Sequence, residues 1–389
     1  METGRRIGIL HVISGLGLGG AEKMLLWSAR HHDRDLVRMG VVSLISDGDL
    51  AGEVRQTGVR VYELGQRRGR LSPSSFQKLV KIIREFRPRI LQGHMYHSNI
   101  LVRLAGSLTG GMTVLSTRHI DTATPVRRLV NSATGFLNDG TLVFSQRVLD
   151  AERKENLFRR PIRLVPYGIE IPDGQETGRE PGSSSGERER NELREKLVIP
   201  PDAFVWTAVG RLTRQKGFIF LVDAFSMVLE NGGDSYLLII GDGEDRGMLE
   251  KRVKKLGVDR RVFFCGFRSD VKDFLDISNA FVLSSLWEGG PLVLLEAMAA
   301  GLPVVSTCVG DASGMVKEGE TGLLVEPGDP EPLADAMLRI QAMGLEARQW
   351  GQEGRRRVKE RYDFKRVQKE MENYYREVAG WMGEFREGG

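Results

Sequence analysis

The feature that most constrains the fold of this chain is an alternation of short apolar runs with longer amphipathic segments, which occurs twice. In the first half, IGILHVI, RILQG and GTLVFS are typical of buried strands, and SSFQKLVKIIREF has the apolar spacing of a helix. The alternation stops near PIRLVPYGIEIPDG and restarts at AFVWTAVG. Strands that alternate with helices form parallel sheets covered by helices. The sequence therefore predicts an α/β protein with two doubly wound, Rossmann-like domains.

Residues 172–195 separate the two halves, because this segment is rich in Gly, Ser and charged residues and almost lacks apolar ones. We interpret it as a linker or mobile loop between an N-terminal domain over 1–171 and a C-terminal domain over 196–364. Residues 365–389 have a helical pattern with no strand after it, and we expect this helix to pack back toward the N-terminal domain. Ligands of open α/β sheets bind at the carboxyl ends of strands, so we expect the two domains to face each other across a ligand-binding cleft.

Composition excludes several classes of protein. Of the 389 residues, 41% are hydrophobic and 28% are charged, as in a soluble globular protein. No run approaches the roughly 18 consecutive apolar residues of a membrane-spanning helix, and IGILHVI leads into glycines without the cleavage pattern of a signal peptide. The two cysteines, Cys265 and Cys308, are far apart, which argues against a disulfide framework or a zinc site and favours a cytoplasmic location.

The net charge of +4 is unevenly distributed. Residues 1–171 hold 26 Lys and Arg against 15 Asp and Glu, a balance of +11, and the rest of the chain has 30 against 37, a balance of −7. A basic N-terminal half favours an anionic partner, such as a phospholipid headgroup, a diphosphate-linked substrate or nucleic acid. The alternative is a merely solvated basic surface.

The segment SSLWEGGPLVLLEAMAAGLPVV joins a strand, a glycine pair, a proline, a helix and a second strand. Pro291 suits the first helical turn, since it has no N–H that needs a partner. The amides of Gly289 and Gly290 then form an anion site that the helix dipole strengthens. Glu288 precedes the helix, and Glu296 lies about a turn inside it, where a carboxylate can accept paired hydrogen bonds from vicinal sugar hydroxyls. The alternative for Glu296 is a solvated residue on a helix face.

A second segment, AVGRLTRQKGFIFLVDAF, ends a strand at Gly210 and places Arg211 and Lys216 in the loop before a helix. Two cations at a helix N-terminus can clamp a diphosphate, because Arg binds a phosphate face with two hydrogen bonds and Lys acts as a point charge. Taken alone, both are ordinary surface cations. The loop around Glu288 makes the diphosphate clamp the better interpretation.

The loop GLGLGG places Gly15, Gly17 and Gly20 in the G-x-G-x-x-G spacing of a dinucleotide-binding fingerprint, after a predicted strand and before a helix. An NAD enzyme has a ribose-binding acid about 20 residues further on, whereas Asp47, at the end of the second strand, lies 27 residues beyond Gly20. The sequence therefore argues against NAD binding. We expect Gly15 and Gly17 to allow a turn.

The two segments resemble the signatures G-R-L-x-x-x-K-G and E-G-x-P-x-x-L-x-E-A-M-A-x-G-x-P-V-V of the retaining glycosyltransferases of family four, also called glycosyl transferases group 1. The resemblance includes GG-A-E near residue 20, H-x-x-H-S-N at 94–99, TRH at 117–119, VPYGIE at 165–170 and GDGE at 241–244. It implies the GT-B fold and transfer of a sugar from a nucleotide-diphosphate sugar to an acceptor hydroxyl, with retention of configuration. It further implies a lipid-linked glycan acceptor in polysaccharide or lipopolysaccharide biosynthesis, no metal or other cofactor, and no nucleic-acid partner.

The resemblance also implies roles for single residues. Arg211 and Lys216 would hold the donor diphosphate, Glu296 would bind the ribose hydroxyls, and Gly19 and Gly20 would let the backbone approach the donor phosphates. The expected catalytic residues are His119, Glu288, Arg211 and Lys216. The expected donor-binding residues are Gly19, Gly20, Arg211, Lys216, Phe267, Arg268, Glu288, Gly289, Gly290, Pro291, Leu292 and Glu296, and the expected acceptor-side residues are His94, His97 and Asn99.

Some residues depart from the family pattern or allow another interpretation. In GDASG at 310–314, Asp311 replaces a usual Gly and Gly314 stands where Glu is common, which leaves the local donor contacts open. His94 and His97 could bind a metal, but no carboxylate partner is evident.

The segment Asp47-Gly48-Asp49 resembles a metal-binding D-x-D motif, although a turn is the more typical reading. Among whole functions, a nucleotide-sugar epimerase of the same fold and a non-catalytic nucleotide-sugar-binding protein remain alternatives. The basic N-terminal half adds the expectation of peripheral attachment to the inner face of a membrane.

Overall fold

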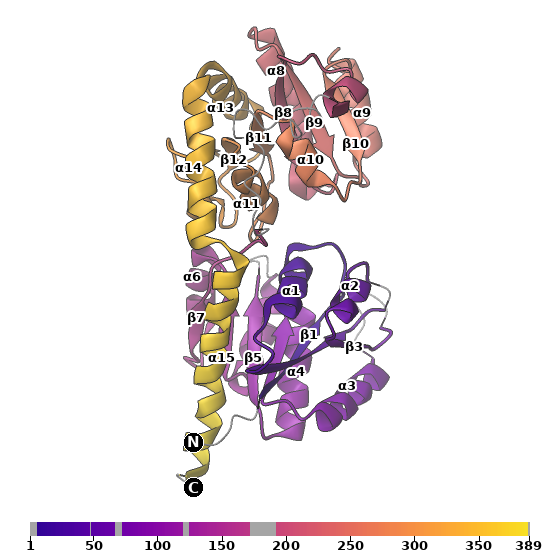
Figure 1. The fold of residues 1–389 in the computed structure, drawn as a ribbon. Helices are drawn as coiled ribbons and strands as arrows, with labels where there is room; N and C mark the ends of the chain where they lie inside the picture. The colour runs from indigo at the N-terminus through magenta and orange to yellow at the C-terminus, as the bar shows by residue number, and fades with distance from the viewer. Residues whose placement is uncertain (1–5, 47, 67–71, 120–123, 172–191, 388–389) are drawn as a thin grey trace. The chain divides into compact units, whose positions relative to one another are not determined.

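The computed structural model describes residues 6–46, 48–66, 72–119, 124–171 and 192–387, with side chains as far as residue 380. The chain divides into two compact units, which are described separately (Figure 1). The first unit combines residues 1–170 with 364–389, and the second comprises residues 171–363.

The first unit contains a seven-stranded parallel sheet with the order β3-β2-β1-β4-β5-β6-β7. Because the order reverses between β1 and β4, the carboxyl ends of these two strands define the switch point where ligands of such sheets bind. The strands are β1 (Ile7–Ile13), β2 (Val37–Ser43), β3 (Arg60–Glu63), β4 (Ile90–His94), β5 (Thr113–Arg118), β6 (Gly140–Val143) and β7 (Ile162–Leu164).

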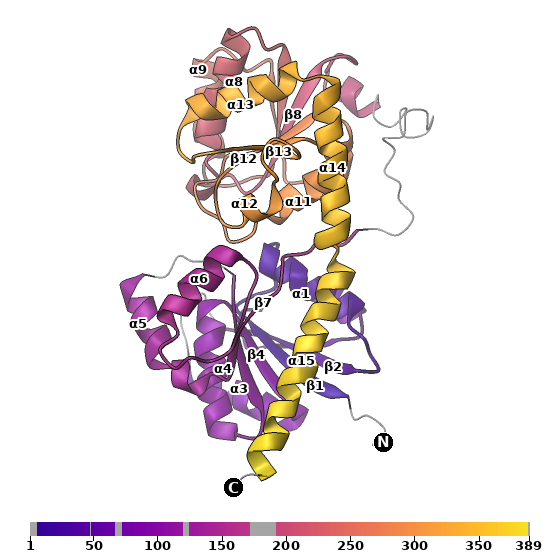
Figure 2. The ribbon, with the colours of Figure 1, turned by 90° about the vertical axis from the view of Figure 1, so that its left-hand side faces the viewer.

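Helices cover both faces of this sheet (Figures 1 and 2). Leu10 and Val12 of β1 pack in one core cluster with residues of α3 and α4, whereas α15 packs against α1, β1 and β5 on the other face. The helices are α1 (Gly20–His31), α2 (Ala51–Gln56), α3 (Pro73–Phe86), α4 (Met95–Thr109), α5 (Pro125–Ala133), the 3-10 turn η1 (Gly135–Leu137), α6 (Gln146–Glu155) and α15 (Phe364–Glu387).

The C-terminal helix α15 is a single helix of 24 residues and belongs to the first unit. Its backbone carbonyl at Val378 accepts a hydrogen bond from the Thr113 hydroxyl of β5, and the Tyr375 hydroxyl donates to Oε1 of Gln92 on β4. A methyl group added at Gly168 would lie 2.8 Å from a methyl of Val367, so this glycine lets the chain pass close to α15. The first unit is therefore built from two segments that are distant in sequence.

The second unit contains a six-stranded parallel sheet with the order β10-β9-β8-β11-β12-β13, whose switch point lies between β8 and β11. Its strands are β8 (Phe204–Val209), β9 (Ser235–Ile240), β10 (Val262–Gly266), β11 (Ala280–Leu283), β12 (Val304–Thr307) and β13 (Gly322–Val325). Its helices are η2 (Arg214–Lys216), α8 (Phe218–Glu230), α9 (Arg246–Lys255), α10 (Val271–Asp276), α11 (Leu292–Ala299), α12 (Ala312–Met315), α13 (Pro330–Ala342) and α14 (Leu345–Arg361).

The two parallel sheets with interleaved helices confirm the predicted fold class. The predicted linker over 172–195 lies mostly outside the described residues. Its last part is helical at 192–196, and Arg194 there is buried and donates hydrogen bonds to the carbonyl of Ile277. These last residues are part of the second unit and not of a loop.

Candidate functional site

The loops that follow β8 and β11 meet at the switch point of the second sheet. The Lys216 ammonium lies 2.5 Å from Oε1 of Glu288, and the Ser285 hydroxyl donates to the same oxygen at 2.8 Å. The two charged side chains are 19% and 9% exposed, so this ion pair is largely shielded from water. Arg211, in the same loop as Lys216, is exposed. The structure thus brings together Lys216 and Glu288, which lie 72 residues apart in sequence.

Backbone contacts hold these two loops in register. The amide of Leu286 donates to the carbonyl of Gln215 at 2.8 Å, and the Ser284 hydroxyl donates to the carbonyl of Lys216 at 3.0 Å. Gly217 caps α8 with a φ of 62°, and a methyl group there would lie 2.1 Å from the carbonyl oxygen of Ser284. Only glycine satisfies both requirements, so Gly217 is what lets the Lys216 loop approach β11.

The glycine pair after Glu288 leads directly into α11. Pro291 is the N-cap residue and Leu292 the first helical residue, so the helix begins one residue later than predicted, and Pro291 is not inside its first turn. Glu296 lies half-buried on α11, one turn from this end. Glu288, Gly289, Gly290 and Glu296 therefore occupy one short segment that starts at the switch point.

The segment GDASG lies against this glycine pair. The amide of Asp311 donates to the carbonyl of Gly289 at 3.0 Å, and Gly310, with a φ of 56°, has no room for a side chain because the same carbonyl oxygen is 2.4 Å away. A methyl group at Gly314 would meet the Asp311 carboxylate at 2.9 Å. The segment in which Asp311 and Gly314 differ from the family pattern thus forms a tightly packed turn beside the predicted anion site.

Phe267 and Arg268 follow β10, which is the edge strand of the sheet and lies two strands away from β8. Phe267 is 65% exposed, and the Arg268 guanidinium pairs with Asp270 and lies over the ring of Phe274 at 5.1 Å. They are not in contact with the Lys216–Glu288 pair in the described structure. An exposed aromatic ring there remains free to stack on a planar ligand.

In the first unit, three histidines line adjacent strands at the carboxyl edge of the sheet. His11 lies on β1, His94 ends β4, and His119 follows β5 directly. The Nδ1 of His11 and the Nε2 of His94 are 3.0 Å apart and share a hydrogen bond, and the rings of His94 and His119 are stacked with centroids 6.0 Å apart. Phe144 stacks on the other side of His119 at 4.9 Å. Sequence reasoning found His94 and His119 but missed His11, which looked like one residue of a buried strand.

The three imidazoles are enclosed and incompletely paired. Both ring nitrogens of His119 and the Nδ1 of His94 are shielded from solvent and have no hydrogen-bond partner among the described residues. Burial lowers the pKa of His119 to about 4 and that of His11 to about 3, and it lowers the pKa of His94 well below its usual value. All three rings are therefore neutral at pH 7 and able to hydrogen-bond a ligand without carrying charge.

The predicted acceptor-side residues have different environments. Asn99 is buried, its amide nitrogen donates to the carbonyl of Thr117, and its amide oxygen accepts from the amide of Thr117. These two bonds hold the end of β5 and leave the second amide hydrogen of Asn99 for a further contact, so its place on the acceptor side stays a prediction. His97 is half-buried against the edge of Tyr96, and burial together with the nearby Arg127 charge lowers its pKa.

The glycine loop after β1 does not need Gly15 and Gly17 for a turn, contrary to what the sequence had led us to expect. Gly15 and Gly17 have no positive φ and nothing closer than 3.8 Å to an added methyl group, so neither is required for a turn. The close approach is at Gly48, where a methyl group would lie 2.6 Å from the carbonyl oxygen of Leu16. Asp47 lies outside the described residues.

Gly19 is the N-cap of α1 and Gly20 its first residue, and no side chain caps this helix end. A methyl group at Gly19 would meet the carboxylate of Glu22 at 2.3 Å. The Glu22 carboxylate therefore lies against the start of this helix, at the glycine that the sequence assigned to phosphate approach.

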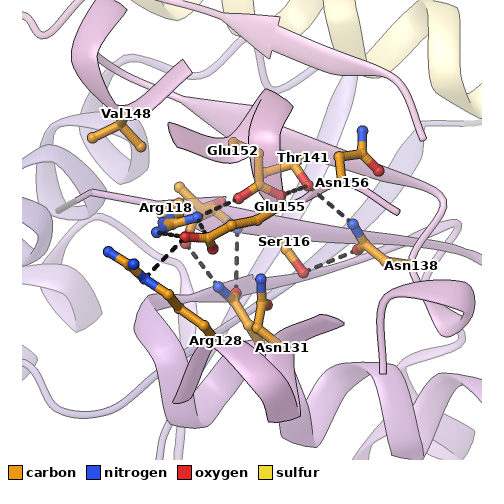
Figure 3. A network of polar contacts seen from close by, with 12 residues as sticks. Ser116, Arg118, Arg128, Asn131, Asn138, Thr141, Val148, Glu152, Glu155 and Asn156 are labelled. Carbon is orange, nitrogen blue, oxygen red and sulfur yellow. Dashed lines mark hydrogen bonds and ion pairs between the residues drawn. The ribbon is translucent and has the colours of Figure 1, made fainter. Parts of the chain in front are cut away.

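A buried polar network, which the sequence did not reveal, anchors the strand end before His119 (Figure 3). Arg118, the last residue of β5, forms ion pairs of 2.8 Å with both Glu152 and Glu155 of α6. Glu152 is 6% exposed and also accepts from the Thr141 hydroxyl of β6. Since Arg118 immediately precedes His119, the network fixes the backbone from which that histidine projects.

Among the described residues, no group of three or more His, Cys, Asp and Glu side chains is close enough to bind a metal ion. In the same part of the chain, no helix is both long and apolar enough to cross a membrane.

Two Rossmann-like parallel sheets with interleaved helices, and a shielded Lys–Glu pair at the switch point of the second, define the GT-B class of protein. Residues 189–357 match the family described as glycosyl transferases group 1, and residues 18–171 match glycosyltransferase family 4. The chain belongs to the group 1 glycosyltransferases, as the sequence motifs predicted.

Several named proteins are similar to this chain. An Escherichia coli UDP-Gal:alpha-D-GlcNAc-diphosphoundecaprenol alpha-1,3-galactosyltransferase is 29% identical over 68% of this chain and 70% of its own length. The Rhizobium meliloti lipopolysaccharide core biosynthesis glycosyltransferase LpsE is 40% identical, but over only 38% of this chain and 43% of its own length. The crystal structure of Anabaena HepE in complex with UDP superposes with a TM-score of 0.79, covers 95% of this chain and 99% of HepE, and is 19% identical, a level that shows the shared fold.

Proposed function

We propose that this protein is a retaining glycosyltransferase that moves a sugar from a nucleoside-diphosphate sugar to a hydroxyl of a lipid-linked glycan in polysaccharide or lipopolysaccharide biosynthesis. The observation that carries the proposal is the shielded pair of Lys216 and Glu288 at the switch point of the second sheet, with Arg211 in the same loop as Lys216. The names of the relatives support the acceptor class, since one acts on a diphosphoundecaprenol-linked sugar and another in lipopolysaccharide core synthesis.

The second unit supplies groups that suit a nucleoside diphosphate. Lys216 and Arg211 would bind the diphosphate, and the amides of Gly289 and Gly290 would add neutral donors. Lys216 is held by Glu288 at 2.5 Å, so its ammonium is already positioned and partly desolvated before the donor arrives. Fixed cations at a shielded site stabilise the negative charge that grows on the leaving diphosphate, and we propose that no metal is needed for this.

The first unit would supply neutral hydrogen-bonding groups to the sugar. The resemblance places His119 next to the donor sugar, and the structure supports this with two ring nitrogens that have no other partner among the described residues. A neutral imidazole can hydrogen-bond a sugar hydroxyl without opposing positive charge that develops on the sugar ring. We propose retention without a protein nucleophile, with the departing phosphate accepting the acceptor's proton.

A donor panel tests this proposal. The purified protein is offered UDP-, GDP-, ADP- and TDP-sugars, and thermal stabilisation and nucleotide release are measured with and without EDTA. The UDP-sugars come first because a relative is named for UDP-Gal. We expect stabilisation by one nucleotide class and unchanged release in EDTA. No stabilisation by any of the donors would refute the proposal, and release without transfer to any acceptor, with a changed donor sugar, would favour the epimerase.

Variants separate the roles of the two units. Lys216→Ala and Glu296→Ala should weaken donor binding, and loss of one charge-stabilising group typically costs about 2.7–4 kcal/mol of barrier, or 10²–10³ in rate. His119→Ala should bind the donor nearly as well as the wild type and lower turnover. Lys255→Ala, at an exposed position of α9, is the matched control and should change neither. Equal loss of donor binding in all three site variants would contradict these roles.

A further inference from the structure

Helix α5 is unusual in this fold because none of its residues is buried. Val126 and Leu129, three residues apart on one side of the helix, are each 70% exposed. Polar contacts attach the helix to the first unit. The Arg103 guanidinium of α4 donates to the backbone and side-chain oxygens of Asn131, and Arg128 pairs with Glu155 at 3.3 Å. Val126 and Leu129 thus contribute little to the core of the unit, whereas Val130 is half-buried.

More exposed apolar side chains lie next to α5. Phe136 of η1, which follows α5 immediately, is 53% exposed and packs edge-on against Phe158 with ring centroids 5.9 Å apart. Phe158 is 47% and Leu157 70% exposed. A single exposed apolar residue is ordinary, but five on touching segments form a surface that calls for a partner. We call Val126, Leu129, Phe136, Leu157, Phe158 and the exposed cations beside them the α5 surface.

Charges around this surface are segregated by sign. The acidic Glu152 and Glu155 point inward and are held by Arg118, with 8% and 15% of their side chains exposed (Figure 3). Between residues 124 and 160 the exposed charged side chains are Arg127, Arg128, Arg147, Arg153, Lys154 and Arg159, opposed by Asp150. Arg128 also pairs with Glu155 and Arg153 with Asp150, which leaves Arg127, Arg147, Lys154 and Arg159 as the cations in excess. The buried network therefore removes negative charge from a surface that keeps its positive charge.

We propose that the α5 surface binds the surface of an anionic phospholipid bilayer. Aliphatic and aromatic side chains can enter the boundary between headgroups and acyl chains while neighbouring arginines pair with lipid phosphates. A second copy of this chain is disfavoured because a symmetric interface would bring two like-charged surfaces together. Nucleic acid would leave Val126 and Leu129 without apolar partners. The inference deepens the proposed function, since a lipid-linked acceptor is presented at such a surface, but vesicle binding itself requires neither donor nor turnover.

Vesicle flotation with the full chain tests the proposal. Protein is mixed with vesicles of phosphatidylcholine alone or of phosphatidylcholine with an equal amount of phosphatidylglycerol, at low and high salt, and the floated fraction is measured. We expect binding to the anionic vesicles that falls as salt rises, because each cation near such a surface contributes about fivefold to partitioning. Absence of binding, or equal binding to both vesicles, would overturn the proposal.

Variants locate the contact. Val126→Ser combined with Leu129→Ser should lower anionic-vesicle partitioning by about tenfold or more, and Arg153→Gln combined with Lys154→Gln should lower it and weaken its salt dependence. Val198→Ser combined with Leu345→Ser, at positions of the second unit that are 81% and 73% exposed, is the matched control and should bind like the wild type. Thermal melting checks that each variant folds.

Each remaining outcome is decisive. Wild-type binding by the α5 variants would refute the assignment of the surface. A dimer in gel filtration that the Val126 and Leu129 changes dissociate would show that a second copy is the partner. Nucleotide release with a soluble acceptor is measured separately: if it fails while vesicle binding behaves as expected, the proposed function fails and the membrane surface stands.

Discussion

At the scale of single residues, the two sheets differ in the charge of the side chains at their switch points. The second unit pairs full charges, Lys216 with Glu288, whereas the first unit lines its edge with imidazoles that burial keeps neutral. The positions of Lys216 and Glu288 in loops that precede helices could be predicted from sequence because loop and helix-start patterns are local. His11 could not, because its significance depends on His94, 83 residues away, at the end of a neighbouring strand.

The hydrogen bond between His11 and His94 gives a first prediction. In His11→Leu the Nε2 of His94 is left buried without a partner, so the free energy of unfolding should fall by about 1–3 kcal/mol. His11→Asn, whose amide can reach the position of Nδ1, should recover most of this loss. Urea unfolding of both variants measures the difference. If His11→Leu and His11→Asn are equally stable, the hydrogen bond does not matter for folding.

At the scale of elements, the predicted strands and helices of both sheets are present within a few residues of their expected bounds, because their apolar periodicity is strong. Several elements were not predicted, among them helices α5, α6 and α14 and strand β13. The buried side of α14 includes Gly351 and Gly354, which carry no apolar signal, and β13 has only four residues. The sequence showed a polar stretch where the structure has a tightly packed helix.

Close packing at Gly351 gives a second prediction. A methyl group there would lie 2.1 Å from the carbonyl oxygen of Gly301, a backbone atom that cannot move aside, so Gly351→Ala should destabilise the second unit by roughly 1–3 kcal/mol. Gly247→Ala in α9 is the matched control, because nothing lies within 4 Å, and helix propensity should make it stabilising by about 0.5–1 kcal/mol. Thermal melting of both variants measures whether each change raises or lowers the stability. Stabilisation by both would contradict the packing argument.

At the scale of the whole molecule, the fold class and family were predictable from motifs, whereas the contacts of a single buried side chain such as Asn99 were not. The motif H-x-x-H-S-N was visible in the sequence. Only the fold shows that the Asn99 side chain donates to the carbonyl of Thr117 and accepts from its amide. The boundary near residue 195 was similarly placed by composition, whereas the buried Arg194 joins that end to the second unit.

The buried histidines also predict how stability depends on pH. Unfolded histidines take up protons near pH 6.5, whereas folded His119 and His11 remain neutral down to about 4 and 3. The unfolded state therefore binds more protons below pH 6.5. As the pH is lowered from 6.5, the free energy of unfolding should decrease by up to about 1.4 kcal/mol per pH unit for each histidine. Urea unfolding at a series of pH values should show a shallower fall in His119→Asn than in the wild type. Parallel curves would show that His119 is not kept neutral by the fold.

The placement of α15 in the first unit bears on how the protein is made. A ribosome delivers residues 6–170 early, but the sheet face that carries His11 and Gln92 gains its cover only when Tyr375 and Val378 have emerged. The second unit lies between these two segments in sequence, so it can fold before α15 has been synthesised. The surroundings of His11, whose ring lies against Tyr375, are therefore completed only at the end of synthesis, and a chain that ends before α15 would expose this face of the first sheet to chaperones and proteases.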